Sequence, residues 1–114
     1  MDKMTVITGA ATGDKIDLSA ALTTPAGIAT ITDVTASIGA AASLTAALNV
    51  AEDLGGEAGA GDLVYFRWVD GNTYILADKV GGDVGAAVAA ADSVIELVGS
   101  YNAMTAAAGV VTLG

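Results

Sequence analysis

Two runs of apolar and aromatic residues, separated by Asp70-Gly71, form the clearest pattern in the sequence. They cover residues 62–69 and 72–78 and are rich in the β-branched and aromatic residues that favour strands. Asp-Gly between such runs predicts a β-hairpin, because a two-residue type I′ turn needs positive φ at both central residues. That loop predicts three cross-strand pairs: Phe66 with Ile75, Arg67 with Tyr74, and Trp68 with Thr73. Most of the aromatic residues lie here, so we expect the hairpin to anchor the core.

Five further segments have the composition of strands. They are residues 4–8, 14–19, 28–38, 92–99 and 109–114. Residues 14–19 alternate apolar and polar positions, which predicts a short strand or an extended turn. Residues 28–38 are rich in Thr, Ile and Val and are predicted as one strand, bent near Asp33. With the hairpin, the chain has about six or seven predicted strands.

Residues 42–54 change to a helical period. One face of this segment carries Leu44, Ala47, Leu48, Ala51 and Leu54. Ser43 is a candidate N-cap and Gly55-Gly56 a candidate stop. Residues 80–91 are predicted as a loop or a weak helix, and residues 100–108 as a turn or a short helix.

These elements predict a mainly β fold with one or two short helices, arranged as an antiparallel β-sandwich or a β-roll-like sheet. The length of 114 residues fits one β-rich domain spanning 1–114. Within it, residues 1–41 hold the N-terminal strands, residues 42–54 the helix, and residues 62–114 the hairpin and C-terminal strands. The core would consist mostly of small Ala and Val side chains, so we expect backbone pairing, bound ions or neighbouring copies to add stability.

The charge balance excludes several partners. Thirteen acidic residues stand against four basic ones, for a net charge of −9. Nucleic acids and anionic membrane surfaces both need clustered Lys and Arg, so neither is expected as a partner. No apolar run approaches the roughly 20 residues that span a bilayer, so no membrane insertion is expected. The N-terminus lacks the pattern of a cleavable signal peptide.

The sequence contains no Cys and no His. This excludes a Cys nucleophile, a Ser-His-Asp triad and a His/Cys zinc or haem site. Glu52-Asp53 and the pair Asp14 and Asp17 are the candidate carboxylate pairs for acid/base chemistry. A glycosidase cleft also needs many aromatic side chains, and this chain has few, so we expect no enzyme.

Acidic residues near turns are the candidate metal ligands. Seven aspartates make up this set: Asp14, Asp17, Asp62, Asp70, Asp78, Asp83 and Asp92. Several stand beside Gly, and such loops supply the carboxylate and carbonyl oxygens that Ca²⁺ prefers. The sequence has neither an EF-hand loop nor the glycine-rich repeat of a calcium β-roll. The alternative is that Asp and Gly here are ordinary turn formers.

Two surfaces could contact partners. One is the set Tyr65, Arg67, Trp68 and Tyr74, which forms either a patch that binds a carbohydrate or a partner, or the core of the hairpin plus one exposed pair across the strands. The core is the favoured interpretation. Residues 5–8 and 110–113 are short, apolar and uncharged, and strand edges without a charge pair readily with other chains. The alternative is that these two terminal strands pair with each other inside one sheet.

Three sequence motifs together resemble a known family. They are Gly61 to Arg67, the Gly-Asn-Thr-Tyr strand of residues 71–78, and the Asp-Ser-Val-Ile-Glu-Leu-Val-Gly strand that ends at Gly99. In this combination the chain resembles the C-terminal region of bacterial type I-secreted surface-layer and RTX-like calcium-dependent repeat proteins. Asp14 to Ser19 is similar to a recurring element of the same family, and the helix of residues 42–54 matches its Ala-rich helix.

The resemblance covers most of residues 42–114 and a patch near 13–19. It implies export without a cleaved leader, an uncleaved C-terminal export signal, contact with the type I secretion machinery and, as is often the case in the family, calcium-dependent assembly. The glycine-rich calcium repeats of the family are missing from this chain, and the chain is short. A small member without repeats would suit a building block of an extracellular fibre.

These observations predict a secreted structural protein at the cell surface that assembles with itself into a fibre or layer. The expected mechanism is β-strand addition or exchange through residues 4–8 and 109–113, with Ca²⁺ bridging acidic loops as an optional part. Two alternatives remain open. One is a C-terminal export module of a surface protein, and the other is a carbohydrate- or surface-binding adhesin domain.

Overall fold

The computed structural model describes residues 4–21, 30–39, 41–55, 62–78 and 93–114. The elements in chain order are β1 (Met4–Ile7), β2 (Lys15–Asp17), the 3₁₀ helix η1 (Ser19–Ala21), β3 (Thr32–Asp33), α1 (Thr35–Ile38), α2 (Leu44–Gly55), β4 (Asp62–Arg67), β5 (Thr73–Asp78), β6 (Ser93–Leu97), β7 (Met104–Ala107) and β8 (Val110–Leu113). The predicted mainly β fold with short helices is confirmed. The predicted loop or weak helix at residues 80–91 lies outside the described residues.

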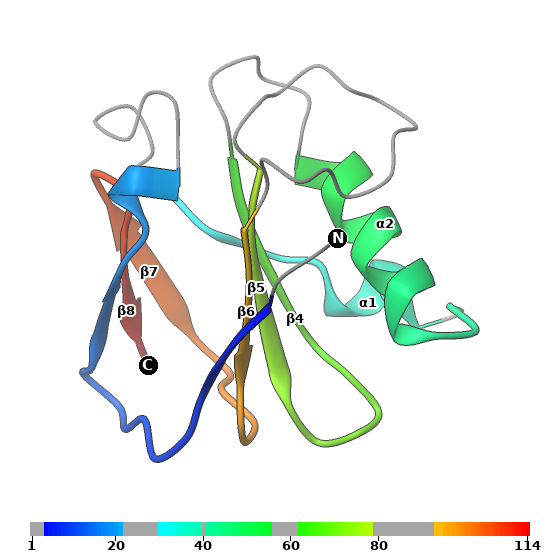
Figure 1. Cartoon of the computed structure of the whole chain (residues 1–114), viewed down its shortest axis with the longest axis horizontal. Helices are drawn as coiled ribbons and strands as arrows, with labels where there is room; N and C mark the ends of the chain where they lie inside the picture. Colours follow the sequence, from blue (N-terminus) through cyan, green and yellow to red (C-terminus); the bar gives the residue numbers. More distant parts are fainter. Residues whose placement is uncertain (1–3, 22–29, 40, 56–61, 79–92) are drawn as a thin grey trace.

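Three layers make up the molecule (Figure 1). A five-stranded sheet with the order β1-β6-β5-β4-β3 forms the middle layer. A three-stranded sheet with the order β2-β8-β7 covers one of its faces, and α1 and α2 lie against the other. The small sheet is antiparallel, whereas the large sheet is mixed, because β1 runs parallel to β6 and β3 runs parallel to β4.

The central strands β4, β5 and β6 of the middle sheet are buried on both faces, so the sheet separates two hydrophobic cores. Toward the small sheet it contributes side chains such as Leu63, Ile75 and Leu97. Toward the helices it contributes side chains such as Phe66 and Leu76. This explains why β4, β5 and β6 are nearly continuous apolar runs, since a strand covered on both faces has no polar side.

The helix predicted at residues 42–54 is confirmed as α2. The Ser43 hydroxyl accepts a hydrogen bond from the Ala46 N–H at 3.1 Å, as an N-cap does. Ala47, Leu48 and Ala51 are buried against the middle sheet. Leu54 departs from the prediction, because 46% of its surface is exposed at the end of the helix.

The hairpin is present, but its predicted register is wrong by one residue. Phe66 lies opposite Tyr74, and Arg67 lies opposite Thr73. The connection is a three-residue loop closed by the Trp68 N–H, which donates to the Asn72 carbonyl oxygen at 2.9 Å. Gly71 has a φ of +88°. Asp-Gly also suits this longer loop, in which a type I turn is followed by a left-handed glycine, so the dipeptide alone does not fix the register.

Two predicted segments have a different structure. Within the described residues 30–38, the strand is limited to Thr32–Asp33, and the chain turns into α1 at Thr35. The Asp33 carboxylate stabilises this turn, since its Oδ1 accepts hydrogen bonds from the Thr35 N–H and hydroxyl. Residues 100–108 contain strand β7 rather than a helix, because pairing with β8 overrides the high helix propensity of alanine.

The two terminal strands belong to different sheets, so they do not pair with each other. β1 is an edge strand of the large sheet. The expectation that residues 109–113 offer a second edge is wrong, because β8 lies between β2 and β7 and is hydrogen-bonded on both sides.

Candidate functional site

The five predicted metal-ligand aspartates that the structure describes do not gather at one place. Asp83 and Asp92 lie outside the described residues. Asp62 and Asp78 lie opposite each other at the end of the hairpin away from its loop. Asp14 precedes β2 and Asp17 ends it, while Asp70 lies in the hairpin loop.

Asp14, Asp17 and Asp70 each accept a hydrogen bond from a nearby backbone N–H. The donors are Ala11 at 2.8 Å to Asp14, Ser19 at 2.9 Å to Asp17, and Asn72 at 2.9 Å to Asp70. The side-chain and backbone hydrogen bonds of Ser19 lower the pKa of Asp17. These are the contacts of turn-forming aspartates. Among the residues that the structure describes, no three acidic side chains come together as metal ligands.

The predicted aromatic patch is not an exposed binding surface. Tyr65 and Tyr74 are 4% and 1% exposed, in the two separate cores. Trp68 is half-buried and packs against the helix-side core, where its ring and that of Phe66 are nearly perpendicular, with centroids 6.3 Å apart. The core interpretation of these aromatic side chains is therefore confirmed.

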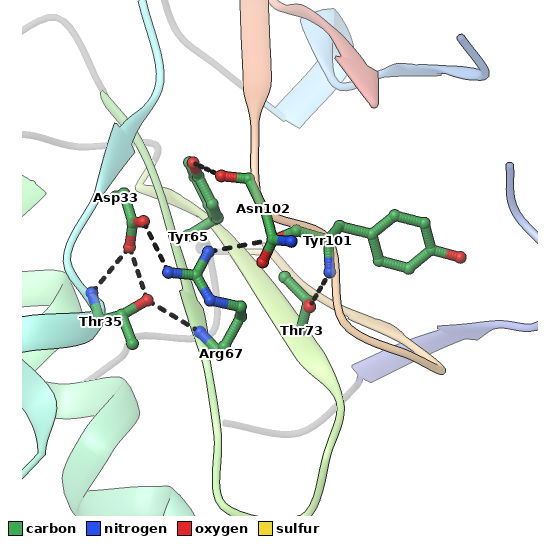
Figure 2. Close-up of polar contacts among 7 residues, drawn as sticks. All are labelled: Asp33, Thr35, Tyr65, Arg67, Thr73, Tyr101 and Asn102. Carbon is green, nitrogen blue, oxygen red and sulfur yellow. Dashed lines mark hydrogen bonds and ion pairs between the residues drawn. The ribbon is translucent and has the colours of Figure 1, made fainter. Parts of the chain in front are cut away.

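Arg67 links three parts of the chain (Figure 2). Its guanidinium donates to Asp33 Oδ2 at 3.0 Å and to the Tyr101 carbonyl oxygen at 3.2 Å. Its backbone N–H donates to the Thr35 hydroxyl at 3.1 Å. Burial would raise the pKa of Asp33, but the hydrogen bonds from Thr35 and Arg67 and the charge of Arg67 outweigh it and lower that pKa. Arg67 is thus engaged within the fold.

The crossover from β6 to β7, residues 98–103, is fastened to the hairpin by buried polar groups. Thr73 is fully buried, and its hydroxyl donates to the Gly99 carbonyl oxygen. The same hydroxyl accepts a hydrogen bond from the Tyr101 N–H (Figure 2). The Tyr65 hydroxyl donates to the Asn102 carbonyl oxygen at 3.3 Å. The Tyr101 hydroxyl donates to the Ala10 carbonyl oxygen in the other crossover, between β1 and β2. These contacts fix how the small sheet sits on the large one.

A second cluster of polar side chains lies on the helix side of the large sheet. The Tyr74 hydroxyl lies 2.6 Å from Asp70 Oδ2 and 2.9 Å from Glu96 Oε1. The Asn72 side-chain amide also donates to Glu96 Oε1 at 2.9 Å. Burial, the two carboxylate acceptors and their negative charges raise the pKa of Tyr74. The Tyr74 phenol therefore stays neutral between the carboxylates of Asp70 and Glu96, at the loop end of the hairpin.

The remaining feature that could act on a partner is the outer edge of β1. Its four residues carry no charge, and 54% of Val6 is exposed. The Val98 N–H donates to the Ile7 carbonyl oxygen, so the backbone of Ile7 faces β6. Because successive residues of a strand point their N–H and C=O groups in opposite directions, those of Val6 face outward. No strand in the described part of the chain pairs with this edge.

Sequence reasoning identified β1 as a candidate edge but missed the polar contacts that Asp33, Arg67, Thr73 and Glu96 make. These residues come from separate elements, so no spacing within the sequence indicates that they meet.

No protein-family model matches the chain, and no curated protein matches it. Among the described residues, no helix is both long and apolar enough to cross a membrane.

Proposed function

We propose that this chain is an extracellular structural protein that assembles with itself by β-strand addition at β1. The uncharged outer edge of β1 carries the proposal. Such an edge presents hydrogen-bond donors and acceptors to any extended strand, and monomeric proteins normally block it with a charge, a proline or a bulge. The resemblance to secreted surface-layer proteins is a second reason for placing the protein outside the cell.

The partner at β1 is β1 of a second copy. Antiparallel pairing about a two-fold axis would place Val6 of one copy opposite Val6 of the other. The outward N–H and C=O groups of both valines would then be exchanged as a hydrogen-bonded pair. The added strand would continue the large sheet from one copy into the next. The exposed Val6 side chains would lie side by side and lose contact with water.

The experiment compares assembly of three Val6 variants with that of the original chain. Val6→Pro removes the outward donor and leaves the bonds to β6 intact, and an edge strand tolerates proline at such a position. Val6→Lys keeps the donor but adds a charge that opposes edge pairing. Val6→Thr keeps both the donor and the β-branched shape and is the matched control.

Circular dichroism and thermal unfolding establish that each variant folds. Sedimentation velocity and negative-stain electron microscopy then measure assembly, both with calcium and with a chelator. We expect Val6→Thr to assemble like the original chain, and Val6→Pro and Val6→Lys to lose the β1 contact in both conditions. Unchanged assembly of a folded Val6→Pro variant would overturn the proposed use of β1.

Assembly of all variants only in the presence of calcium would replace strand addition with ion bridging between copies. Monomers of the original chain at every concentration would overturn self-assembly and leave the export module as the remaining hypothesis. Its test should fuse a passenger to the whole of residues 1–114. β6 pairs with β1 and β8 pairs with β2, so a fragment that begins at residue 55 lacks both partners.

The adhesin alternative is not proposed further, because Tyr65 and Tyr74 are buried and Arg67 is bound to Asp33 and to the Tyr101 carbonyl.

A further inference from the structure

The edge of the small sheet opposite β7 is formed by β2, the blue strand at the left of Figure 1. Its three residues are Lys15, Ile16 and Asp17. Lys15 and Asp17 are exposed, while Ile16 packs partly against the core between the two sheets. In the part of the chain that the structure describes, β2 pairs only with β8, so its other edge is open.

The backbone of β2 presents two residues to this open edge. The Leu113 N–H donates to the Asp14 carbonyl oxygen, and the Leu18 N–H donates to the Gly109 carbonyl oxygen. Positions 14 and 18 therefore face β8, and by alternation position 16 does so too. The N–H and C=O groups of Lys15 and Asp17 consequently point away from the sheet, toward solvent.

We propose that β2 is a self-complementary interface that binds β2 of a second copy in antiparallel fashion, about a two-fold axis at Ile16. In this register Lys15 of each copy lies opposite Asp17 of the other. The outward backbone groups then form two hydrogen-bonded pairs, and the Ile16 residues form the closely spaced pair between them. Both opposite-charge pairs lie on the outer face of the sheet, while Ile16 continues its apolar inner face.

The charges favour this partner over others. With a net charge of −9, two copies repel each other, so a contact that brings a cation of one copy to an acid of the other is favoured. Lys15 forms no ion pair within the described residues, whereas Arg67 is bound to Asp33. A parallel register would place like charges together, as would a slip that put Asp17 opposite Asp17, and such pairs are destabilising.

The β2 contact does not require the β1 contact, but together they would explain a fibre. A two-fold contact uses the same surface on both copies and ends at a dimer. Two different two-fold contacts on one chain, at β1 and at β2, join such dimers into an open row. This extension to a fibre rests on the function proposed above, and the pairing at β2 does not.

The test uses the Val6→Pro chain, in which β1 is blocked, so that any remaining association reports on β2. Lys15→Glu makes both edge charges negative, and Asp17→Lys makes both positive. Each variant alone should weaken dimerisation by about tenfold or more, because every opposite-charge pair becomes a like-charge pair. An equimolar mixture of the two should recover association as a mixed dimer, and so should the single chain that carries Lys15→Asp together with Asp17→Lys.

Sedimentation velocity over a concentration series gives the dimerisation constants, and circular dichroism shows that each variant folds. Association should also weaken as salt is raised, because exposed charges are screened. Dimerisation that is the same in Lys15→Glu as in its parent would overturn the interface. If Val6→Pro has no effect on assembly but Lys15→Glu does, the β1 proposal fails and the β2 proposal holds.

Disulfide cross-linking can detect a β2 contact that is too weak to be measured by sedimentation velocity. The chain has no cysteine, so Ile16→Cys introduces a single thiol. In the proposed register the two residues at position 16 have Cα atoms about 4.5 Å apart, within the range of a disulfide. Oxidation should therefore give a covalent dimer of Ile16→Cys and not of Lys15→Cys, whose two thiols lie diagonally across the axis. Equal cross-linking of both variants would overturn the register.

Discussion

The rings of Phe66 and Tyr74 are stacked, with centroids 5.4 Å apart and planes 21° from parallel. This contact follows from the hairpin register, which places the two residues directly opposite each other on the helix side of the large sheet. Stacking adds to the burial of both rings and orients the Tyr74 hydroxyl toward the loop, where it reaches Asp70 and Glu96. A register shifted by one residue would move one of the two rings to the opposite face.

Replacing Thr73 with valine should reveal how firmly the small sheet is fastened to the large one. Thr73→Val keeps the shape of the side chain but leaves the Gly99 carbonyl and the Tyr101 N–H without their partner. We expect the free energy of unfolding to fall by about 2–4 kcal/mol, because these groups are partly buried. Thr73→Ser retains both hydrogen bonds and should cost only about 1 kcal/mol for the lost methyl group. Urea unfolding of both variants measures the difference, and equal losses would contradict the assigned role of the hydroxyl.

The raised pKa of Tyr74 predicts a specific loss of stability in alkaline solution. Above the usual tyrosine pKa of 10.0, the unfolded chain releases this proton while the folded chain retains it. The contribution of Tyr74 is therefore fully present below that pH and declines as pH rises, by about 1.4 kcal/mol per unit. Unfolding of the original chain and of Tyr74→Phe across this range isolates the effect. The advantage of tyrosine over phenylalanine should shrink with rising pH, and a constant difference would show that the proton is not held.

The turn between β7 and β8 offers a stabilising substitution. Ala108 and Gly109 have φ values of +50° and +81°, the positive pair of a type I′ turn. Alanine is strained there because its Cβ crowds the backbone, whereas asparagine tolerates this region. Ala108→Asn should therefore raise the free energy of unfolding by about 0.5–1 kcal/mol, measured by thermal or urea unfolding. Gly109→Ala is the matched control and should destabilise the fold, and a less stable Ala108→Asn variant would argue against this turn.

Most elements of the fold could be predicted from local patterns. Alternating or β-branched runs indicated β1, β2, β4, β5, β6 and β8, and the period of Leu44, Ala47, Leu48 and Ala51 indicated α2. Two elements were predicted wrongly. In residues 28–38 the hydrogen bonds of Asp33 stabilise a turn into α1, and in residues 104–107 strand pairing overrode the propensity of alanine. At Asp33 the contact is local but involves side-chain hydrogen bonds that hydrophobic periodicity does not report, and in β7 it is pairing with another strand.

The candidate site was less predictable than the elements. Asp14, Asp17 and Asp70 were correctly predicted to lie in loops or at strand ends. Composition alone could not show whether these loops and strand ends come together in the fold. The importance of Lys15 could not be inferred either. An alternation of Lys, Ile and Asp is common, and it becomes self-complementary only when the strand lies at an edge with both charged residues facing outward.

By itself, the sequence determined which segments bury apolar side chains, that the fold is mainly β, and that Cys and His chemistry is absent. Hydrophobic period, turn residues and composition are local properties, so they can be read without knowing the fold. Only the tertiary structure decided that β8 is an inner strand, that β1 and β2 are edges, and that the middle sheet is covered on both faces. These facts depend on which distant strands pair. The free energy of that pairing comes from cross-strand contacts and from burial between segments that are far apart in the sequence. No local pattern encodes these contacts.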